Sequence, residues 1–303
     1  MSANPAIIGD EFKRGFRRQT QWSWSIATAF FFGESGAGLF IVSLFFDFLP
    51  GLVTGLLLTA VGKTAGHLIH LGQPSRAWRA ILKLKSSWVS RGLLAIIVFT
   101  GCGLPYVLHL AGLDFGALPR PLALLLGALA GAAAVVIMLY QGLAMSHSPA
   151  IALWSTGIMP MMSFTYASLA GVALALALGA TASRGLDAQS LSVLKGFELV
   201  LILFLLLMHF SLLHAARYGA EGARKSAELL LKGALAGWFL GAVIIVGLLV
   251  PAAVMGFAVE GSTARLIVTA CVLAGYYTYR VVVFKAGVYD PPQRFTVKLR
   301  RFS

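Results

Sequence analysis

Eight long apolar segments constrain this chain more than any other feature of its sequence. Each is about as long as the ~20 residues that an α-helix needs to cross the ~30 Å hydrocarbon core of a bilayer. Only 12% of the residues are charged, against about 25% in soluble domains, and the mean hydropathy is +0.84. The sequence therefore predicts an all-α, polytopic integral membrane bundle of eight transmembrane helices over residues 22–285. The first segment ends near Phe46, and the others lie near 51–72, 89–111, 121–144, 154–180, 196–217, 233–257 and 264–285.

The 24 lysines and arginines are unevenly divided between the two ends of these helices. Eight spans place both termini on one side of the membrane, together with the loops after spans two, four and six. We assign 19 basic residues to that side, including every one from Arg280 onward, and four to the other. Because positively charged loops face the cytoplasm, we expect a multi-pass protein of the bacterial inner membrane. Residues 1–21 and 286–303 would be cytoplasmic tails, and the net charge of +13 needs no nucleic-acid partner.

The most polar stretch at membrane depth begins in the second span. Lys63, His67 and His70 recur at helical spacing, so they lie within about 60° of one another on one face. An ionisable group costs at least a few kcal/mol at mid-membrane unless it is solvated or paired, which favours a functional role. We expect this stripe to face the bundle interior. His70, close to the end of the span, has the alternative of bonding a loop carbonyl at the interface.

Two further groups of residues are candidates for function. Glu34 is an acid at membrane depth in the first span, and we interpret Lys63 as its structural partner. With His67, these two residues are candidates for a proton path. The loop from Gln73 to Arg91 carries Arg76 and Trp88 among other basic and aromatic residues. Its charges are explained by a solvated loop, whereas its tryptophans indicate a cap over a site or a docking surface.

Aromatic and histidine side chains in the later spans have more than one interpretation. Tyr140, near the cytoplasmic end of the fourth span, either belongs to the aromatic belt or hydrogen-bonds a small amphiphile that enters from the bilayer. Buried histidines can ligate haem b in pairs, but no pair here has a haem-protein signature. We therefore expect neither haem nor a metal site in this chain. The histidines considered are His67, His70, His209 and His214.

Several stretches of the sequence resemble the NrfD/polysulfide reductase membrane-subunit family. They are WSWSIATAFFFGESGAG, GHLIHLGQPSRAWRA followed by SSWVSRG, LYQGL followed by ALWSTGIMPMMSF, and YRVVVFKAG. The His-Leu-Gly-x-Pro block with its Arg and Trp residues is the most specific of these. The resemblance implies an eight-helix subunit without haem that binds quinone or quinol. It also implies two partners, an iron–sulfur ferredoxin-like subunit and a molybdopterin or tungstopterin catalytic subunit.

The resemblance also implies roles for individual residues. His70 matches the histidine implicated in quinol binding in the related dimethyl sulfoxide reductase anchors, and Tyr140 matches the tyrosine that lines the quinone site in polysulfide reductase-like members. The polar pair found in the first helix of those members is replaced here by Ile26 and Ala29. We expect His70 and Tyr140 to bond the oxygens of ubiquinone or menaquinone and to exchange protons with them. Further candidate quinone contacts are His67, Glu34, Arg76 and Trp88.

These inferences together predict the quinone-reactive subunit of a respiratory oxidoreductase. It would anchor the complex and pass electrons between the iron–sulfur subunit and the quinone pool, with a cytoplasmic catalytic subunit that oxidises an acyl-CoA-type or sulfur substrate. One alternative is a proton-coupled secondary transporter. Inverted repeats would favour it, and this sequence has no evident repeats. The other is a haem-b cytochrome anchor, which an optical spectrum of the purified protein distinguishes.

Overall fold

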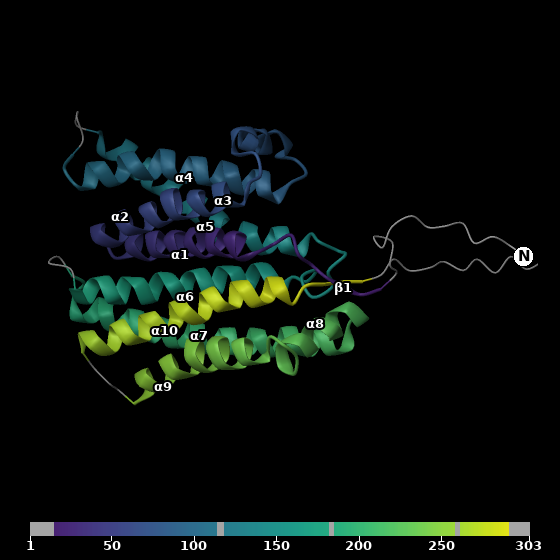
Figure 1. Ribbon diagram of the computed structural model, residues 1–303. Coiled ribbons are helices and arrows are strands. Elements are labelled where there is room, and N and C mark those ends of the chain that lie inside the picture. Colours follow the sequence, from purple (N-terminus) through teal and green to yellow (C-terminus); the bar gives the residue numbers. More distant parts are fainter. Residues whose placement is uncertain (1–14, 114–117, 182–184, 258–260, 291–303) are drawn as a thin grey trace, which may run out of the picture.

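Eight helices in the described part of the chain are long and apolar enough to cross a membrane, as the sequence predicts. The computed structural model describes residues 15–113, 118–181, 185–257 and 261–290 (Figure 1). The spans are α1 (Trp24–Phe45), α2 (Leu49–Leu57) continued by π-helical Leu58–Lys63 and α3 (Thr64–His70), α4 (Trp88–Leu110), α5 (Arg120–Ser146), α6 (Ile158–Thr181), α7 (Ala188–Tyr218), π-helical Gly237–Leu249 continued by α9 (Val250–Gly256), and α10 (Ser262–Lys285).

The largest difference from the predicted limits is the start of the sixth span. α7 begins at Ala188, eight residues before the predicted start at residue 196. The Asp187 side chain accepts a hydrogen bond from the backbone N–H of Ser190 at 2.9 Å, which caps this end of the helix. Such a cap satisfies one of the N–H groups that have no partner within the helix. The added turns, AQSLSVLK, alternate polar and apolar residues, so a search for a continuous apolar run does not include them.

Short elements gather at the end of the bundle where the described part of the chain begins and ends, at residues 15 and 290, and we call this the termini end (Figure 1). A 3-10 helix, Pro74–Lys83, connects α3 to α4. α8 (Glu221–Leu231) follows α7 and buries one face, which includes Ala223, Ala227 and Leu230. Strands β1 (Arg17–Arg18) and β2 (Val288–Tyr289) pair in antiparallel fashion. Parts of the two tails are therefore joined to each other.

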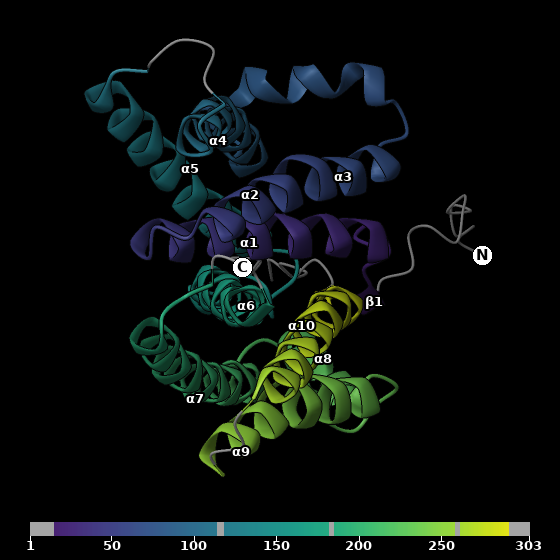
Figure 2. The ribbon, with the colours of Figure 1, turned by 90° about the vertical axis from the view of Figure 1, so that its left-hand side faces the viewer.

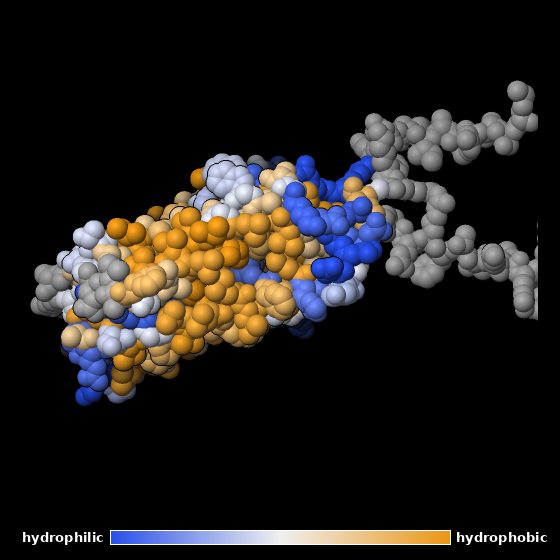
Figure 3. All heavy atoms as spheres, turned by 90° about the horizontal axis from the view of Figure 1, so that it is seen from below, coloured by the Kyte–Doolittle hydropathy of each residue, from blue (hydrophilic) through white to orange (hydrophobic). Residues whose placement is uncertain are grey.

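The bundle consists of two halves that meet at α1 and α6 (Figure 2). α1 also packs against the second, fourth and eighth spans, and α6 against the fourth, sixth and eighth. α1 and α6 are accordingly the two most buried spans. Figure 3 shows apolar side chains over much of the middle of one long face, with hydrophilic ones gathered mostly toward the ends. This distribution suits a bilayer around the middle of the bundle.

Glycines set the distance between α1 and α6 at the junction. A Cβ atom on Gly38 would overlap the carbonyl oxygen of Ala167, and one on Gly171 would overlap the backbone of Gly38. Helices in lipid associate largely through close packing of this kind, because lipid tails are as apolar as leucine. The glycine-rich segment of the first span therefore fixes how the two halves meet.

We predict that Gly171→Ala destabilises the protein, because the new methyl group has no room against α1. Overpacking of this kind costs about 1–3 kcal/mol, which a lower melting temperature in detergent would report. The matched control is Gly196→Ala, since no atom lies within 4 Å of a Cβ atom placed there. Equal melting temperatures for the two variants would contradict the packing argument.

Candidate functional site

A buried ion pair joins the two halves of the bundle. Glu34 on α1 pairs with Arg280 on α10, and both side chains are at most 1% exposed. The Tyr276 hydroxyl donates to the same carboxylate oxygen, Oε2. Arg280 Nη2 also donates to Ser163 Oγ on α6 at 2.8 Å. Charged groups this deep in a bundle persist when they are paired and hydrogen-bonded, so this cluster holds α1, α6 and α10 together.

This ion pair corrects two expectations from the sequence. The ion-pair partner of Glu34 is Arg280, whereas Lys63 donates its hydrogen bond to Tyr140. Arg280 lies within α10 and is buried, so it is not one of the 19 loop and tail residues that the sequence assigns to the side of the termini, and 18 remain in that assignment. The informative signal was an arginine inside an apolar span, with an acid inside another span to pair with it.

Lys63 and Tyr140 form a second buried pair. Lys63 Nζ donates to the Tyr140 hydroxyl oxygen at 2.5 Å, and the two side chains are 0% and 3% exposed. Lys63 ends the π-helical segment of the second span, and such widened turns are frequent at functional sites. Each side chain lies against a glycine of another helix: Lys63 against Gly33 of α1, and Tyr140 against Gly92 of α4. A side chain at either glycine would displace the pair.

The ring of Phe30 lies among the charged and aromatic groups of the site. Its centroid is 5.7 Å from Lys63 Nζ and 6.0 Å from Arg280 Cζ. The centroids of the Tyr140 and His67 rings are 6.4 and 6.3 Å away. A cation near an aromatic face is stabilised by the ring quadrupole. Phe30 thus connects the two buried pairs, a role that the sequence analysis missed because a phenylalanine in an apolar run carries no signal.

The two histidines of the second span form the half-buried edge of the site. His67 faces Phe30 of α1, and His70 Nδ1 lies 3.0 Å from Ser25 Oγ, also on α1. Both rings are partly exposed. The prediction that this stripe faces the bundle interior therefore holds for Lys63, which is completely buried, whereas His67 and His70 lie against α1 at the half-exposed edge. The sequence does not predict the role of Ser25, since its contact with His70 exists only because α3 approaches α1.

The loop residues contribute less than expected. Arg76 is exposed on the 3-10 helix, and among the described residues its side chain forms no hydrogen bond or ion pair with the site. Trp88 packs against the apolar cluster that contains Tyr140, and the Arg91 guanidinium lies 4.3 Å from its ring. Trp88 begins α4 one turn before Gly92, so it supports Tyr140 from outside. The structure thus brings Trp88, and not Arg76, near the site.

The two histidines in the second half of the bundle differ in their surroundings: His209 is buried and hydrogen-bonded, and His214 is exposed. His209 Nε2 lies 3.2 Å from the Tyr166 hydroxyl, and its Nδ1 lies 2.8 Å from the Leu205 carbonyl oxygen. A haem iron needs one of these nitrogens, so the ring fits as an axial ligand only if a hydrogen bond is broken. His214 is exposed on α7. These rings are therefore poorly arranged to ligate a haem between them.

Two buried polar groups of the first half have unsatisfied atoms. Neither amide atom of Gln141 has a hydrogen-bond partner among the described residues, and Glu34 Oε1 also lacks one there. Gln141 follows Tyr140 directly and is fully buried. Buried polar atoms are nearly always satisfied by protein, water or ligand. The site therefore has capacity for further hydrogen bonds beyond those within the protein.

We predict that Arg280→Met costs much more stability than the double substitution Glu34→Leu with Arg280→Met. The single change leaves a buried carboxylate without its partner, a loss of about 3–5 kcal/mol, whereas replacing both charges by apolar groups is often close to neutral. Melting temperatures of the purified variants measure the difference. A double variant as unstable as the single one would show that the charges are not coupled.

Comparison with known proteins identifies the family of this chain. The family model described as "Polysulphide reductase, NrfD" matches residues 14–291, which is most of the chain. No curated protein sequence matches. The matched range includes both buried pairs and all eight spans. The chain therefore belongs to the NrfD family of polysulphide reductase membrane subunits, which are membrane components of respiratory oxidoreductase complexes.

Proposed function

We propose that this protein is the membrane anchor and quinone-reactive subunit of a molybdenum- or tungsten-dependent oxidoreductase. It would pass electrons between an iron–sulfur subunit and the quinone pool. The observation that carries the proposal is the buried Lys63–Tyr140 hydrogen bond beside the half-buried histidines of α3. This arrangement places proton donors and acceptors at membrane depth, next to an edge that a lipid-soluble molecule can approach. Family membership supports the same role.

The residues at this edge suit a quinone headgroup, which has two carbonyl oxygens to be bonded. The Ser25 hydroxyl is hydrogen-bonded to Nδ1 of His70. The other ring nitrogen, Nε2, is therefore available to a headgroup oxygen. The Tyr140 hydroxyl would bond the other oxygen from the buried side. Because Tyr140 is 3% exposed here, binding requires side chains at the histidine edge to move aside. His67 and Phe30 line the route between the two proposed contacts.

A bound quinone supplies two-electron chemistry coupled to two protons. Tyr140 can donate its hydroxyl proton and regain one from Lys63 Nζ, which is hydrogen-bonded to it. His70 can give or take the second proton, because imidazole changes charge near neutral pH. Glu34 balances positive charge nearby through its ion pair with Arg280. We propose Glu34, Lys63 and His67 as the proton path that connects the site to the termini end.

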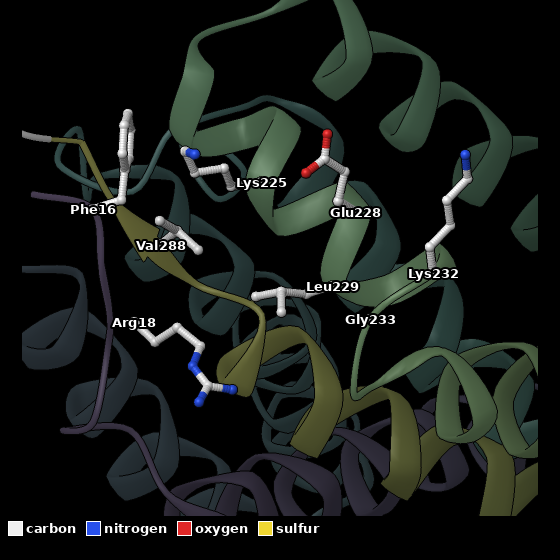
Figure 4. A pocket seen from close by; sticks show the side chains of 8 residues that line it. All are labelled: Phe16, Arg18, Lys225, Glu228, Leu229, Lys232, Gly233 and Val288. Carbon is white, nitrogen blue, oxygen red and sulfur yellow. The ribbon is translucent and has the colours of Figure 1, made fainter.

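A basic hollow at the termini end is a candidate docking surface for the iron–sulfur partner. It measures about 550 Å³ and lies between α8, β1 and β2 (Figure 4). Its cationic residues are Arg18, Lys225 and Lys232, with Glu228 as the acid. Such a surface suits an acidic partner, because complementary charge steers association. With 18 basic residues on this side, we propose that the partners are cytoplasmic and that the catalytic subunit oxidises an acyl-CoA-type or sulfur substrate there.

We predict that Tyr140→Phe and His70→Ala abolish quinone-linked turnover while the complex still assembles. Each change removes a group that would hydrogen-bond the quinone and move a proton. Turnover is measured as quinone reduction or quinol oxidation by the isolated complex, and assembly by co-purification. His214→Ala serves as the control, because this histidine is exposed in the other half of the bundle. Unchanged turnover in either of the first two variants would contradict the site assignment.

We predict that the double substitution Lys225→Glu with Lys232→Glu weakens capture of the partner subunits. Reversing two charges in the hollow opposes an acidic surface, and the loss should be greatest at low ionic strength, where charge is least screened. Co-purification yields measure the effect. Arg120→Glu, an exposed change at the opposite end of the bundle, should leave the yield unaltered. Equal yields for all three proteins would place the docking surface elsewhere.

A further inference from the structure

A cavity of about 320 Å³ lies at the end of the bundle opposite the termini end, between α7, α9 and α10. The proposed quinone site does not use it. Its polar lining residues include Lys195, Glu198, Arg265 and Thr269, while Val254 and Met255 of α9 are apolar. Lys195, Met255 and Arg265 all lie within eight residues of the end of their helix. The cavity therefore opens near the membrane border and extends inward to Glu198.

Glu198 is an isolated acid in the wall of this cavity. Its side chain is 2% exposed, and its Oε1 atom has no hydrogen-bond partner among the described residues. The buried Nε atom of Arg265 lacks a partner there as well, so these two groups do not satisfy each other. The Thr269 hydroxyl is already used, because it donates to the Ala173 carbonyl oxygen at 2.9 Å. The unpaired atoms require water or a ligand.

The cavity is large enough to hold water molecules that could hydrogen-bond the unpaired atoms of Glu198 and Arg265. A water molecule takes up roughly 30 Å³ of liquid volume, so several fit beside Glu198. The charged groups that line the cavity with this acid are Lys195 on its own helix and Arg265 on α10. The other lining helices contribute apolar residues: Leu176 from α6, and Val254 and Met255 from α9. Among the residues that the structure describes, Glu198 is the one acid in the lining of the cavity.

Apolar side chains close the cavity toward the centre of the bundle. Ile202 and Leu205 follow Glu198 on the same side of α7, and both are completely buried. His209 lies eleven residues beyond Glu198, or about 16 Å along the helix. Its ring nitrogens are held by Tyr166 and Leu205. Glu198 is therefore separated from the buried pairs of the candidate site and faces only the opposite end.

We propose that this cavity is a water-filled proton-exchange site on the face opposite the termini, with Glu198 as its acid. The O–H bond of the carboxyl group breaks and the proton passes to a cavity water, which becomes hydronium; protonation is the reverse. Lys195 and Arg265 provide positive charge beside the carboxylate that is left. The proposal concerns an acid that has no role in the quinone site, so it stands whether or not the quinone assignment holds.

Carbodiimide labelling tests whether Glu198 exchanges protons. Dicyclohexylcarbodiimide reacts with protonated carboxyls in apolar surroundings, and the adduct is mapped by mass spectrometry on the full-length protein in native membranes. We expect an adduct at Glu198 that decreases as the pH is raised and is absent in Glu198→Gln. A pH-independent adduct, or none at Glu198, would overturn the proposal.

Cysteine accessibility tests the water in the cavity and the direction in which it opens. A membrane-impermeant thiol reagent should modify the Met255→Cys variant when it is added to the face opposite the termini. The Ile202→Cys variant should stay unmodified, because this position lies beyond the cavity. An unreactive Met255→Cys variant would show that the cavity is dry or closed. Equal modification of the two variants would show that water continues inward, which would overturn the one-sided site.

Discussion

The ion pair between Glu34 and Arg280 is the interaction on which the arrangement of this bundle depends. Two charges inside a membrane are costly unless each satisfies the other. Glu34 belongs to the first half of the bundle, whereas Arg280 and the hydroxyl groups that complete the cluster belong to the second. The two halves therefore have a specific polar contact at the depth where α1 meets α6 and α10. Close glycine packing at Gly38 and Gly171 complements it.

The positions of the other site residues follow from α1 once this ion pair is made. Gly33, the residue before Glu34, provides the space that Lys63 occupies. Phe30, one turn earlier, lies within about 6.4 Å of both buried pairs and of His67. Ser25, at the start of the helix, holds His70. One helix thus carries contacts to every part of the site, from the sealed interior to the half-buried edge.

The sequence predicts the spans better than it predicts the contacts between them. Apolar length alone defines eight helices, and helical spacing alone places Lys63 and His67 on one face of the second span. The partners of these residues depend on how distant helices pack, which no local pattern encodes. Glu34 and Arg280 are 246 residues apart, and the roles of Ser25 and Phe30 arise only when α3 and α10 approach α1. The π-helical segment that ends at Lys63 likewise has no recognisable signal in the sequence.

The central claim is that a quinone headgroup binds between the histidine edge of α3 and Tyr140 of α5. A photoreactive quinone, activated in membranes that contain the assembled complex, tests this most directly. The account predicts that the label maps by mass spectrometry to the peptides around His70 and Tyr140, and that excess natural quinone suppresses it. Labelling confined to α6–α10, or labelling that natural quinone does not suppress, would contradict the account.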